Sequence, residues 1–272
     1  MVGLSTQFDQ STWANSLLLG WRIIRGRKIL RGRTSVLKEY GEQWGKYGCY
    51  LDKAWTLDDW LFIKGLDDLP QNHNHHGSFK RGVFDSGAYY REKLYQTIKE
   101  HFSTATSVTE YGCGIGRNLL YLKKVLPHLQ VYGYELCNEG VLIGRRAATK
   151  FGLSVNISEL DYVNDSSSRY IFPNTDLAFT MFSLEQLPDQ NKLALVNILD
   201  HVHLGSIHLE PVPENYPYTF RGLLGRIYSS KANYLKNFDH NVRSLMLTSI
   251  TSRVLDTSHN PVMYPTIYVL KK

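Results

Sequence analysis

The chain has 272 residues, of which 43% are hydrophobic and 21% are charged, a composition typical of a globular domain with a buried core. Its three cysteines, Cys49, Cys113 and Cys137, are odd in number and form no Cys-x-x-Cys pair. This pattern excludes a disulfide framework and a cysteine-based zinc site, and it indicates a reducing, cytoplasmic compartment.

The net charge of +6 originates in the first part of the chain. Residues 1–38 contain seven Lys or Arg and one acid, whereas the remaining 234 residues contain 24 basic and 24 acidic side chains. This distribution predicts a neutral domain with a basic N-terminal arm. We therefore do not expect nucleic acid to be the main partner.

Residues 13–33 of the arm combine an apolar helical stripe with arginines. Leu17, Leu18, Trp21 and Ile24 fall on one helical face, and the segment is too short and too charged to span a bilayer. The stripe fits two arrangements. It either lies on a membrane surface with arginines at the headgroups, which would place the protein at the inner face of a membrane, or it packs on the main domain or on a second copy in a homodimer. Packing is the commoner fate of such a stripe.

Residues 39–85 alternate aromatic and acidic side chains and then become polar at residues 71–77. His73, His75 and His76 lie in this polar stretch, but no cysteine or carboxylate pattern accompanies them, so we predict a solvated loop and no metal site. Loops of this kind often close over a substrate. We expect residues 1–85 to form a basic amphipathic extension and a cap on the substrate side of a main domain, residues 86–272.

From residue 86, predicted strands and helices alternate, which indicates a parallel sheet with helices on both faces. Strands are expected at 107–111, 130–134, 153–157, 175–182, 206–209, 252–256 and 266–270. Helices are expected at 89–102, 117–126, 138–150, 189–201 and 237–248.

A glycine-rich turn follows the first of these strands. Gly112, Gly114 and Gly116 alternate with other residues between the strand and the next helix, and Glu110 comes two residues before them. Glycine lacks Cβ, so such a turn brings its backbone close to a ligand. Glu135 follows the last glycine by 19 positions, at the expected end of the second strand, where a carboxylate can accept hydrogen bonds from ribose hydroxyls. The spacing predicts a nucleoside-cofactor site.

The motif discriminates between cofactors. A dinucleotide fingerprint needs glycine at the position of Arg117, and the Gly-Lys-Ser/Thr of a phosphate-binding P-loop is absent. The pattern Glu-x-Gly-x-Gly-x-Gly instead resembles the first motif of class I S-adenosylmethionine-dependent methyltransferases. That cofactor carries no pyrophosphate, and its ammonium group suits an acidic turn.

The resemblance covers residues 86–272. It implies a three-layer, Rossmann-like α/β fold with a seven-stranded sheet, mostly parallel with an antiparallel C-terminal strand, to which this chain adds an N-terminal helical extension. S-adenosyl-L-methionine is the implied cofactor. The implied binding residues are Glu110, Gly112, Gly114 and Gly116 at its methionine half, Glu135 at the ribose, Leu136 beside the adenine, Asp161 with Tyr162 at the adenine amino group, Phe182 near the methyl group, and Tyr90 near the carboxylate.

Substrate residues are expected at the carboxyl ends of the fourth and fifth strands of the sheet. His208 and Glu210 share a face of the fifth strand, and ionisable side chains on a central parallel strand need a reason. We predict that one of them removes a proton from a substrate hydroxyl, with Glu185 as a lesser candidate. The alternative is a hydrogen-bonded structural pair.

The methyl acceptor is expected to be a hydroxyl, or an amine, of a small molecule or glycan. The segment after Phe182 lacks the Asp/Asn-Pro-Pro-Tyr/Phe motif of enzymes that methylate base amines, and no cysteine follows Cys137 to serve cytosine C5 chemistry. The Leu-Glu-Gln-Leu-Pro and His-Leu-Glu-Pro segments resemble those of methyltransferases in natural-product or polysaccharide biosynthesis. A tRNA or protein methyltransferase, and a non-catalytic protein that keeps the fold, are the alternatives.

Overall fold

The computed structural model describes residues 20–21, 23, 25–26, 33–164 and 171–272, with the side chains of residues 33–36 left aside. Most of the predicted stripe at residues 13–33 therefore lies outside the described residues, and only Trp21 of its four apolar positions is described. No described helix is long and apolar enough to cross a bilayer.

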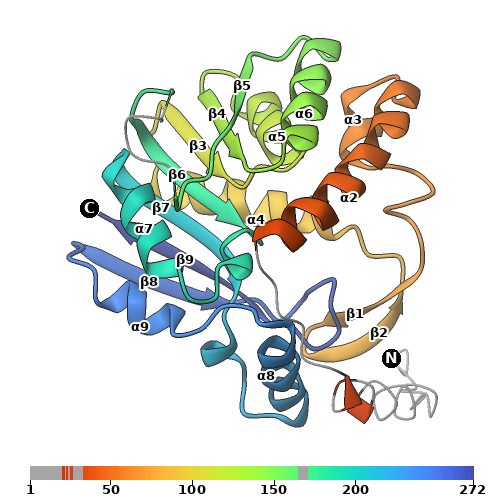
Figure 1. Ribbon diagram of the computed structural model, residues 1–272, viewed down its shortest axis with the longest axis vertical. Helices are drawn as coiled ribbons and strands as arrows, with labels where there is room; N and C mark the ends of the chain where they lie inside the picture. The colour runs from red at the N-terminus through yellow and green to blue at the C-terminus, as the bar shows by residue number, and fades with distance from the viewer. Residues whose placement is uncertain (1–19, 22, 24, 27–32, 165–170) are drawn as a thin grey trace, which may run out of the picture.

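A seven-stranded sheet with helices on both faces forms the centre of the molecule (Figure 1). The strand order is β5-β4-β3-β6-β7-β9-β8. Strand β9 runs antiparallel to β7 and β8, and the other neighbours pair in parallel. The predicted three-layer, Rossmann-like fold is confirmed. The strands are β3 Ser107–Tyr111, β4 Gln130–Glu135, β5 Val155–Glu159, β6 Thr175–Met181, β7 Val202–Pro211, β8 Ser249–Val254 and β9 Pro265–Lys271.

The helices of the main domain match the predicted ones in number up to β7 and differ after it. They are α4 Ser86–His101, α5 Arg117–Val125, α6 Asn138–Lys150, α7 Asn191–Asp200, α8 Phe220–Ala232 and α9 Phe238–Arg243. Helix α8 was not predicted from the sequence. The predicted helix 237–248 is too long, because the Thr248 N–H donates to the Lys271 carbonyl and draws the chain into the sheet.

The N-terminal part consists of α2 Arg33–Lys53, α3 Leu57–Leu61 and a hairpin of β1 Gln71–His75 and β2 Ser78–Gly82. Helix α2 packs along α6, so the extension lies directly on the main domain (Figure 1). The boundary at residue 85 stays a prediction.

The expectation of a solvated loop at residues 71–77 is wrong. His73 and Asn74 are buried, and the backbone of Asn74 exchanges two hydrogen bonds with Ser258 at 2.9 Å. This bridge to the C-terminal part pairs the backbone groups that a loop would leave to water. His75 and His76 follow in the same hairpin, and no cluster of three or more metal-binding side chains occurs among the described residues.

The packing and the strand order of the sheet indicate at which of its edges a ligand would bind. Two apolar clusters cover the two faces of the sheet, one centred on Val108 and Leu177 and the other on Ala178 and Tyr268. The strand order reverses between β3 and β6, because β4 and β5 continue to one side and β7 to the other. Open α/β sheets bind ligands outside the carboxyl ends of the strands at such a point.

Candidate functional site

A cavity of about 630 Å³ opens at the carboxyl ends of β3, β4 and β6. This volume lies in the usual range of small-molecule and cofactor sites. Nine of the ten predicted cofactor residues line it: Glu110, Gly112, Gly114, Glu135, Leu136, Asp161, Tyr162, Phe182 and Tyr90. The roles of these residues stay predictions, but their convergence on one cavity is a finding.

The glycine turn forms the floor of the cavity. Gly112 has a φ of +75°, and a Cβ built on it would lie 2.0 Å from Ser183 Oγ. Gly114 has a φ of +54°, and its Cβ would lie 3.1 Å from the indole of Trp44. Both positions therefore favour glycine for its conformation, and Gly112 also leaves no space for a side chain. Gly116 does not line the cavity: it precedes α5, and its Cβ would lie 2.8 Å from Ile157 in the packed layer behind the turn.

Glu135 lies at the end of β4 and supports the turn. Its Oε2 accepts the Gly114 N–H at 2.7 Å, and its Oε1 accepts the Cys137 N–H at 3.0 Å. Burial raises the pKa of this carboxyl group, and the same N–H groups oppose the rise. Each carboxylate oxygen has two lone pairs, so both retain accepting capacity on the cavity side.

Glu110 is a buried carboxyl group with one unsatisfied oxygen. Its Oε1 accepts the Asn118 side-chain N–H at 2.7 Å, whereas its Oε2 has no hydrogen-bond partner among the described residues. Burial raises the pKa of Glu110 well above its ordinary value, and the nearby Glu135 carboxyl adds to the rise. A buried acceptor in this state is costly, and a donor or a cation in the cavity would satisfy it.

The loop after β5 forms the opposite side of the cavity. Asp161 Oδ1 accepts the N–H groups of Val163 and Asn164 at 3.2 and 3.1 Å, so the carboxylate holds a turn that keeps it at the cavity. The Tyr162 hydroxyl lies 2.9 Å from Ser183 Oγ and ties this loop to the segment after β6.

Tyr90 and Phe182 form an aromatic wall with a third residue, His259. The rings of Tyr90 and Phe182 lie 4.8 Å apart, and the ring of His259 lies 5.2 Å from that of Phe182. The Tyr90 hydroxyl accepts the backbone N–H of His259 at 3.2 Å, and it also lies 3.2 Å from the ring Nδ1 of His259. Burial lowers the pKa of His259 to about 4, so its ring is neutral near pH 7. His259 was not predicted, because it precedes β9 on a chain segment far from the glycine motif and belongs to no local pattern.

The predicted catalytic residues separate in the structure. Glu185 lines the cavity, whereas His208 and Glu210 do not. His208 is fully buried in the sheet, its ring nitrogens lie 2.9 Å from Thr180 Oγ1 and 2.8 Å from Ser206 Oγ, and burial lowers its pKa to about 3. The structure therefore favours the alternative of a structural, hydrogen-bonded side chain.

Glu210 is also a buried, hydrogen-bonded side chain with a structural role. Its Oε1 accepts the N–H groups of Ser183 and Leu184 at 3.1 Å, and its Oε2 accepts that of Glu185 at 3.2 Å. Burial raises its pKa to about 7, although the Thr180 hydroxyl and these three N–H groups oppose the rise. Glu210 thus holds the loop that carries Glu185 at the cavity.

Helix α2 closes the cavity from the N-terminal side. Tyr40, Gln43, Trp44 and Tyr47 line it, and the rings of Tyr40 and Tyr47 lie 5.5 and 5.7 Å from that of Trp44. This role of α2 was not predicted from the sequence. The signal was present, because Tyr40, Trp44 and Tyr47 have the i, i+4, i+7 spacing of one helical face.

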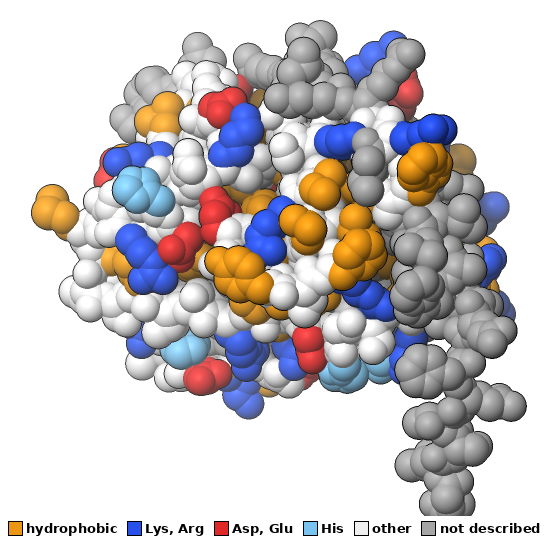
Figure 2. All heavy atoms as spheres, turned by 90° about the horizontal axis from the view of Figure 1, so that it is seen from below, with side chains coloured by type: hydrophobic (Ala, Val, Ile, Leu, Met, Phe, Trp, Pro, Cys, Tyr) orange, Lys and Arg blue, Asp and Glu red, His pale blue; other side chains and the backbone are white. Residues whose placement is uncertain are grey.

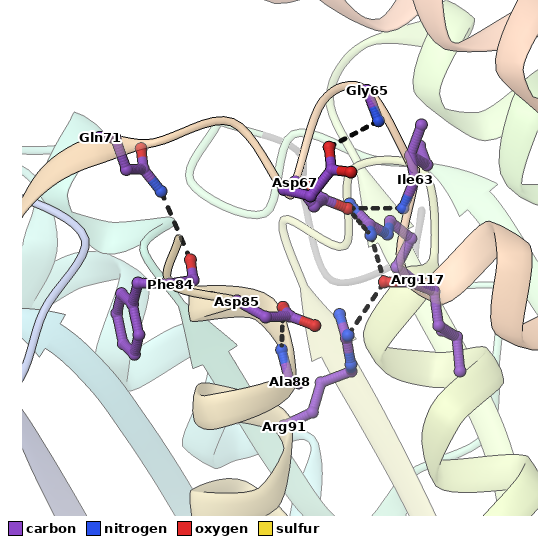
Figure 3. Close-up of polar contacts among 11 residues, drawn as sticks. Ile63, Gly65, Asp67, Gln71, Phe84, Asp85, Ala88, Arg91 and Arg117 are labelled. Atoms are coloured by element: carbon purple, nitrogen blue, oxygen red, sulfur yellow. Dashed lines mark hydrogen bonds and ion pairs between the residues drawn. The ribbon is translucent and has the colours of Figure 1, made fainter. Parts of the chain in front are cut away.

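Two arginines lie at the cavity beside the loop that follows α3. Figure 3 shows Arg91 and Arg117 pointing toward one another below Asp67. Both donate to the Leu61 carbonyl, and Arg117 also pairs with Asp67 at 2.6 Å. Burial and the neighbouring Arg117 lower the pKa of Arg91 to about 10, so the Arg91 guanidinium group is charged near neutral pH. The carboxylates of Asp67 and Asp85 oppose the fall in the pKa of Arg91, so the two guanidinium groups are accompanied by two acids.

No protein-family model and no curated protein matches the chain. Its structure is similar to the plantazolicin methyltransferase BpumL in complex with a triazolic desmethylPZN analog and SAH, with a TM-score of 0.52 and 12% identity over 88% of this chain and 99% of that chain. It is also similar to BpumL in complex with SAH, with a TM-score of 0.50 and 13% identity over 86% of this chain and 99% of that chain. For the magnesium protoporphyrin IX methyltransferase ChlM from Synechocystis PCC 6803 with bound SAH, the TM-score is 0.49 and the identity is 12%, over 69% of this chain and 86% of that chain. The chain has the Rossmann-like fold of class I S-adenosylmethionine-dependent methyltransferases, as its motif predicted.

Proposed function

We propose that the protein is an S-adenosylmethionine-dependent methyltransferase that binds its cofactor in the cavity at the β3–β6 switch point. The observation that carries this proposal is the meeting of Glu110, the glycine turn, Glu135 and Asp161 in one cavity. These residues come from the ends of three successive strands. A fold alone does not specify a function, but a site with this donor set does suggest one.

The residues fit the cofactor at both of its ends. The unsatisfied Oε2 of Glu110 suits the ammonium group of the methionine tail, and Arg91 suits its carboxylate. The remaining lone pairs of Glu135 suit the two ribose hydroxyls, while Asp161 and Leu136 suit the adenine. When bound, the cofactor supplies a methyl group attached to a positively charged sulfur, and transfer of this methyl group leaves the sulfur as a neutral thioether.

We further propose that the acceptor is a hydroxyl or an amine of a small molecule or glycan. The α2 cover and the aromatic wall of Tyr90, Phe182 and His259 support an enclosed acceptor. Glu185 lines the cavity beside this wall and is the residue to which we assign the acceptor proton. Most of the acceleration would come from alignment of the acceptor lone pair with the methyl–sulfur bond.

A role in natural-product or polysaccharide biosynthesis, in the cytoplasm, completes the proposal. BpumL is by its name a methyltransferase of plantazolicin, and the likeness covers almost all of its chain. The three cysteines are free thiols, as expected in a reducing compartment.

Calorimetry with S-adenosylhomocysteine tests the cofactor site without knowledge of the acceptor. We expect the wild-type protein to bind and the Glu135→Ala variant to lose about 10- to 100-fold in affinity, since hydrogen bonds to a charged group are lost. The control is Glu159→Ala, because Glu159 pairs with Glu135 in the sheet register but is exposed and lies outside the cavity lining. Absence of heat with both S-adenosylhomocysteine and S-adenosylmethionine, or equal affinity of wild type and Glu135→Ala, would contradict the proposal.

Turnover is tested separately by release of S-adenosylhomocysteine over a panel of hydroxyl- and amine-bearing acceptors. Release with at least one member supports the enzyme. Binding of the cofactor without release over the whole panel would favour a non-catalytic protein that keeps the fold.

A further inference from the structure

A short N-terminal segment lies along helix α8 on the lower side of the molecule. A Cβ at Gly20 would lie 3.3 Å from the Leu224 side chain, and Ile23 is buried against Leu224 and Val262. At the other end, Lys231 Nζ donates to the Gly26 carbonyl at 2.7 Å. Residues 20–21, 23 and 25–26 therefore follow α8 over most of its length, and Ile23 packs against it.

The outer side of this pair is apolar and exposed. Phe220 and Leu223, one turn apart on α8, are 59% and 52% exposed. Trp21 is 55% exposed, and Tyr218, just before the helix, is 97% exposed. Exposed aromatic and aliphatic side chains that gather on one face mark an interaction surface.

Cationic side chains accompany these apolar ones. The Arg25 guanidinium lies 4.1 Å from the ring centroid of Trp21, and that of Arg226 lies 4.8 Å from the ring centroid of Tyr218. Residues 215–237 contain four Lys or Arg and no acid. Figure 2 shows the molecule from below, where apolar and Lys or Arg side chains are interspersed with some Asp or Glu side chains. We call Trp21, Arg25, Tyr218, Phe220, Leu223 and Arg226 the α8 face.

We propose that the α8 face binds an anionic lipid surface. Helices that lie in a membrane interface insert aromatic and aliphatic side chains between headgroups and place guanidinium groups against lipid phosphates, and the α8 face has both kinds of side chain with no acid among them. Trp and Tyr favour this interface, because one part of each ring system is apolar and another donates a hydrogen bond. An RNA would also be attracted by the charge, but it would not need exposed Leu223 and Phe220. An acidic protein could use both the cations and the apolar side chains, so binding to an acidic polypeptide in place of vesicles is an outcome that the test must separate.

Co-sedimentation of the full chain with vesicles tests this proposal. We expect it to pellet with vesicles of phosphatidylcholine and phosphatidylglycerol, and to pellet at least about tenfold less with phosphatidylcholine alone, because each cation near an anionic surface strengthens binding several-fold. Raising the salt from about 0.05 to about 0.5 M should weaken the binding, since the Debye length shortens severalfold.

Two variants and two matched controls separate surface contact from loss of structure. Phe220→Ser combined with Leu223→Ser removes apolar contact, and Arg25→Glu reverses one charge; each should reduce binding about tenfold or more. The controls are Trp55→Ser and Lys46→Glu, which change an exposed indole and an exposed cation on the α2–α3 part of the chain and should bind as the wild type.

Calorimetry with S-adenosylhomocysteine keeps this proposal distinct from the proposed function, because the α8-face variants should retain the wild-type affinity for it. The proposal is overturned by equal pelleting with neutral and anionic vesicles, by absence of pelleting, or by control variants that lose as much as the α8-face variants. Salt-sensitive binding to an RNA or to polyglutamate, without vesicle binding, would assign the face to a different partner.

Discussion

Replacement of Glu210 with Gln removes a titratable group from the centre of the sheet and tests its structural role. Glu210 accepts three backbone N–H groups from the loop that carries Glu185. A Gln side chain has nearly the same shape, but its amide N–H₂ cannot accept the third of these hydrogen bonds. The two proteins should therefore differ in stability and in how stability depends on pH.

The magnitude follows from the pKa of Glu210, which burial raises from 4.5 to about 7 in the folded protein. Since the folded protein holds this proton more tightly than the unfolded chain, the group adds stability at low pH and loses that contribution as the pH rises through about 7. Between about pH 5 and about pH 8, the wild type should lose about 2.5 kcal/mol relative to the variant.

Urea unfolding of both proteins at several pH values measures this difference directly. The comparison cancels other titrating groups such as Glu110, Glu135 and His259, because they are present in both proteins. His208 touches the same Thr180 hydroxyl, but its folded-state pKa of about 3 keeps its ring neutral across the measured range. Parallel stability curves for wild type and Glu210→Gln would refute the reasoning, because they would show that this carboxyl does not titrate between pH 5 and 8.

Three further substitutions probe the cavity. Gly112→Ala should cost at least about 1–3 kcal/mol in urea unfolding and reduce cofactor binding, because its φ of +75° and the closeness of Ser183 Oγ leave no room for a methyl group; wild-type stability would contradict this. Trp44→Ala should weaken binding of S-adenosylhomocysteine about tenfold in calorimetry, because Trp44 covers the glycine turn at the cavity. The control Trp55→Ala, at an exposed indole, should leave the affinity unchanged, and equal affinities of both variants would show that α2 does not contribute to cofactor binding. Glu185→Gln should reduce turnover about 100-fold with little change in cofactor affinity, and an unchanged rate across pH would exclude it as the proton acceptor.

The sheet and the residues of the proposed cofactor site were predictable from local patterns. The limits of β3 at residues 107–111 and of α6 at residues 138–150 were predicted correctly, because a strand of β-type residues ended in the glycine turn and Gly152 marked the end of the helix. The spacing from the glycine turn to Glu135 fixed which strand ends meet, since parallel strands place their carboxyl ends at one edge.

The residues of the proposed acceptor side were not predictable in the same way. The sequence shows that His208 and Glu210 share a face of β7, but it does not show where β7 ends. The strand continues to Pro211, and Thr180 of β6 lies beside His208 in register, so both side chains remain inside the sheet. His259 reaches the cavity through a long-range contact with Tyr90, which no local pattern encodes.

Helix α8 connects the two proposals. Its outer side carries Phe220 and Leu223 of the α8 face, and Asn233, which ends the helix in a left-handed conformation, lines the cavity. If the α8 face rests on a membrane, a lipid-linked acceptor would be concentrated on the side of the molecule where Asn233, at the end of α8, lines the cavity. The two sites would then be coupled through substrate supply alone. Anionic vesicles should accordingly lower the apparent KM for a lipid-linked acceptor without changing the affinity for S-adenosylhomocysteine, and a change in that affinity would show instead that membrane contact reshapes the cofactor site itself.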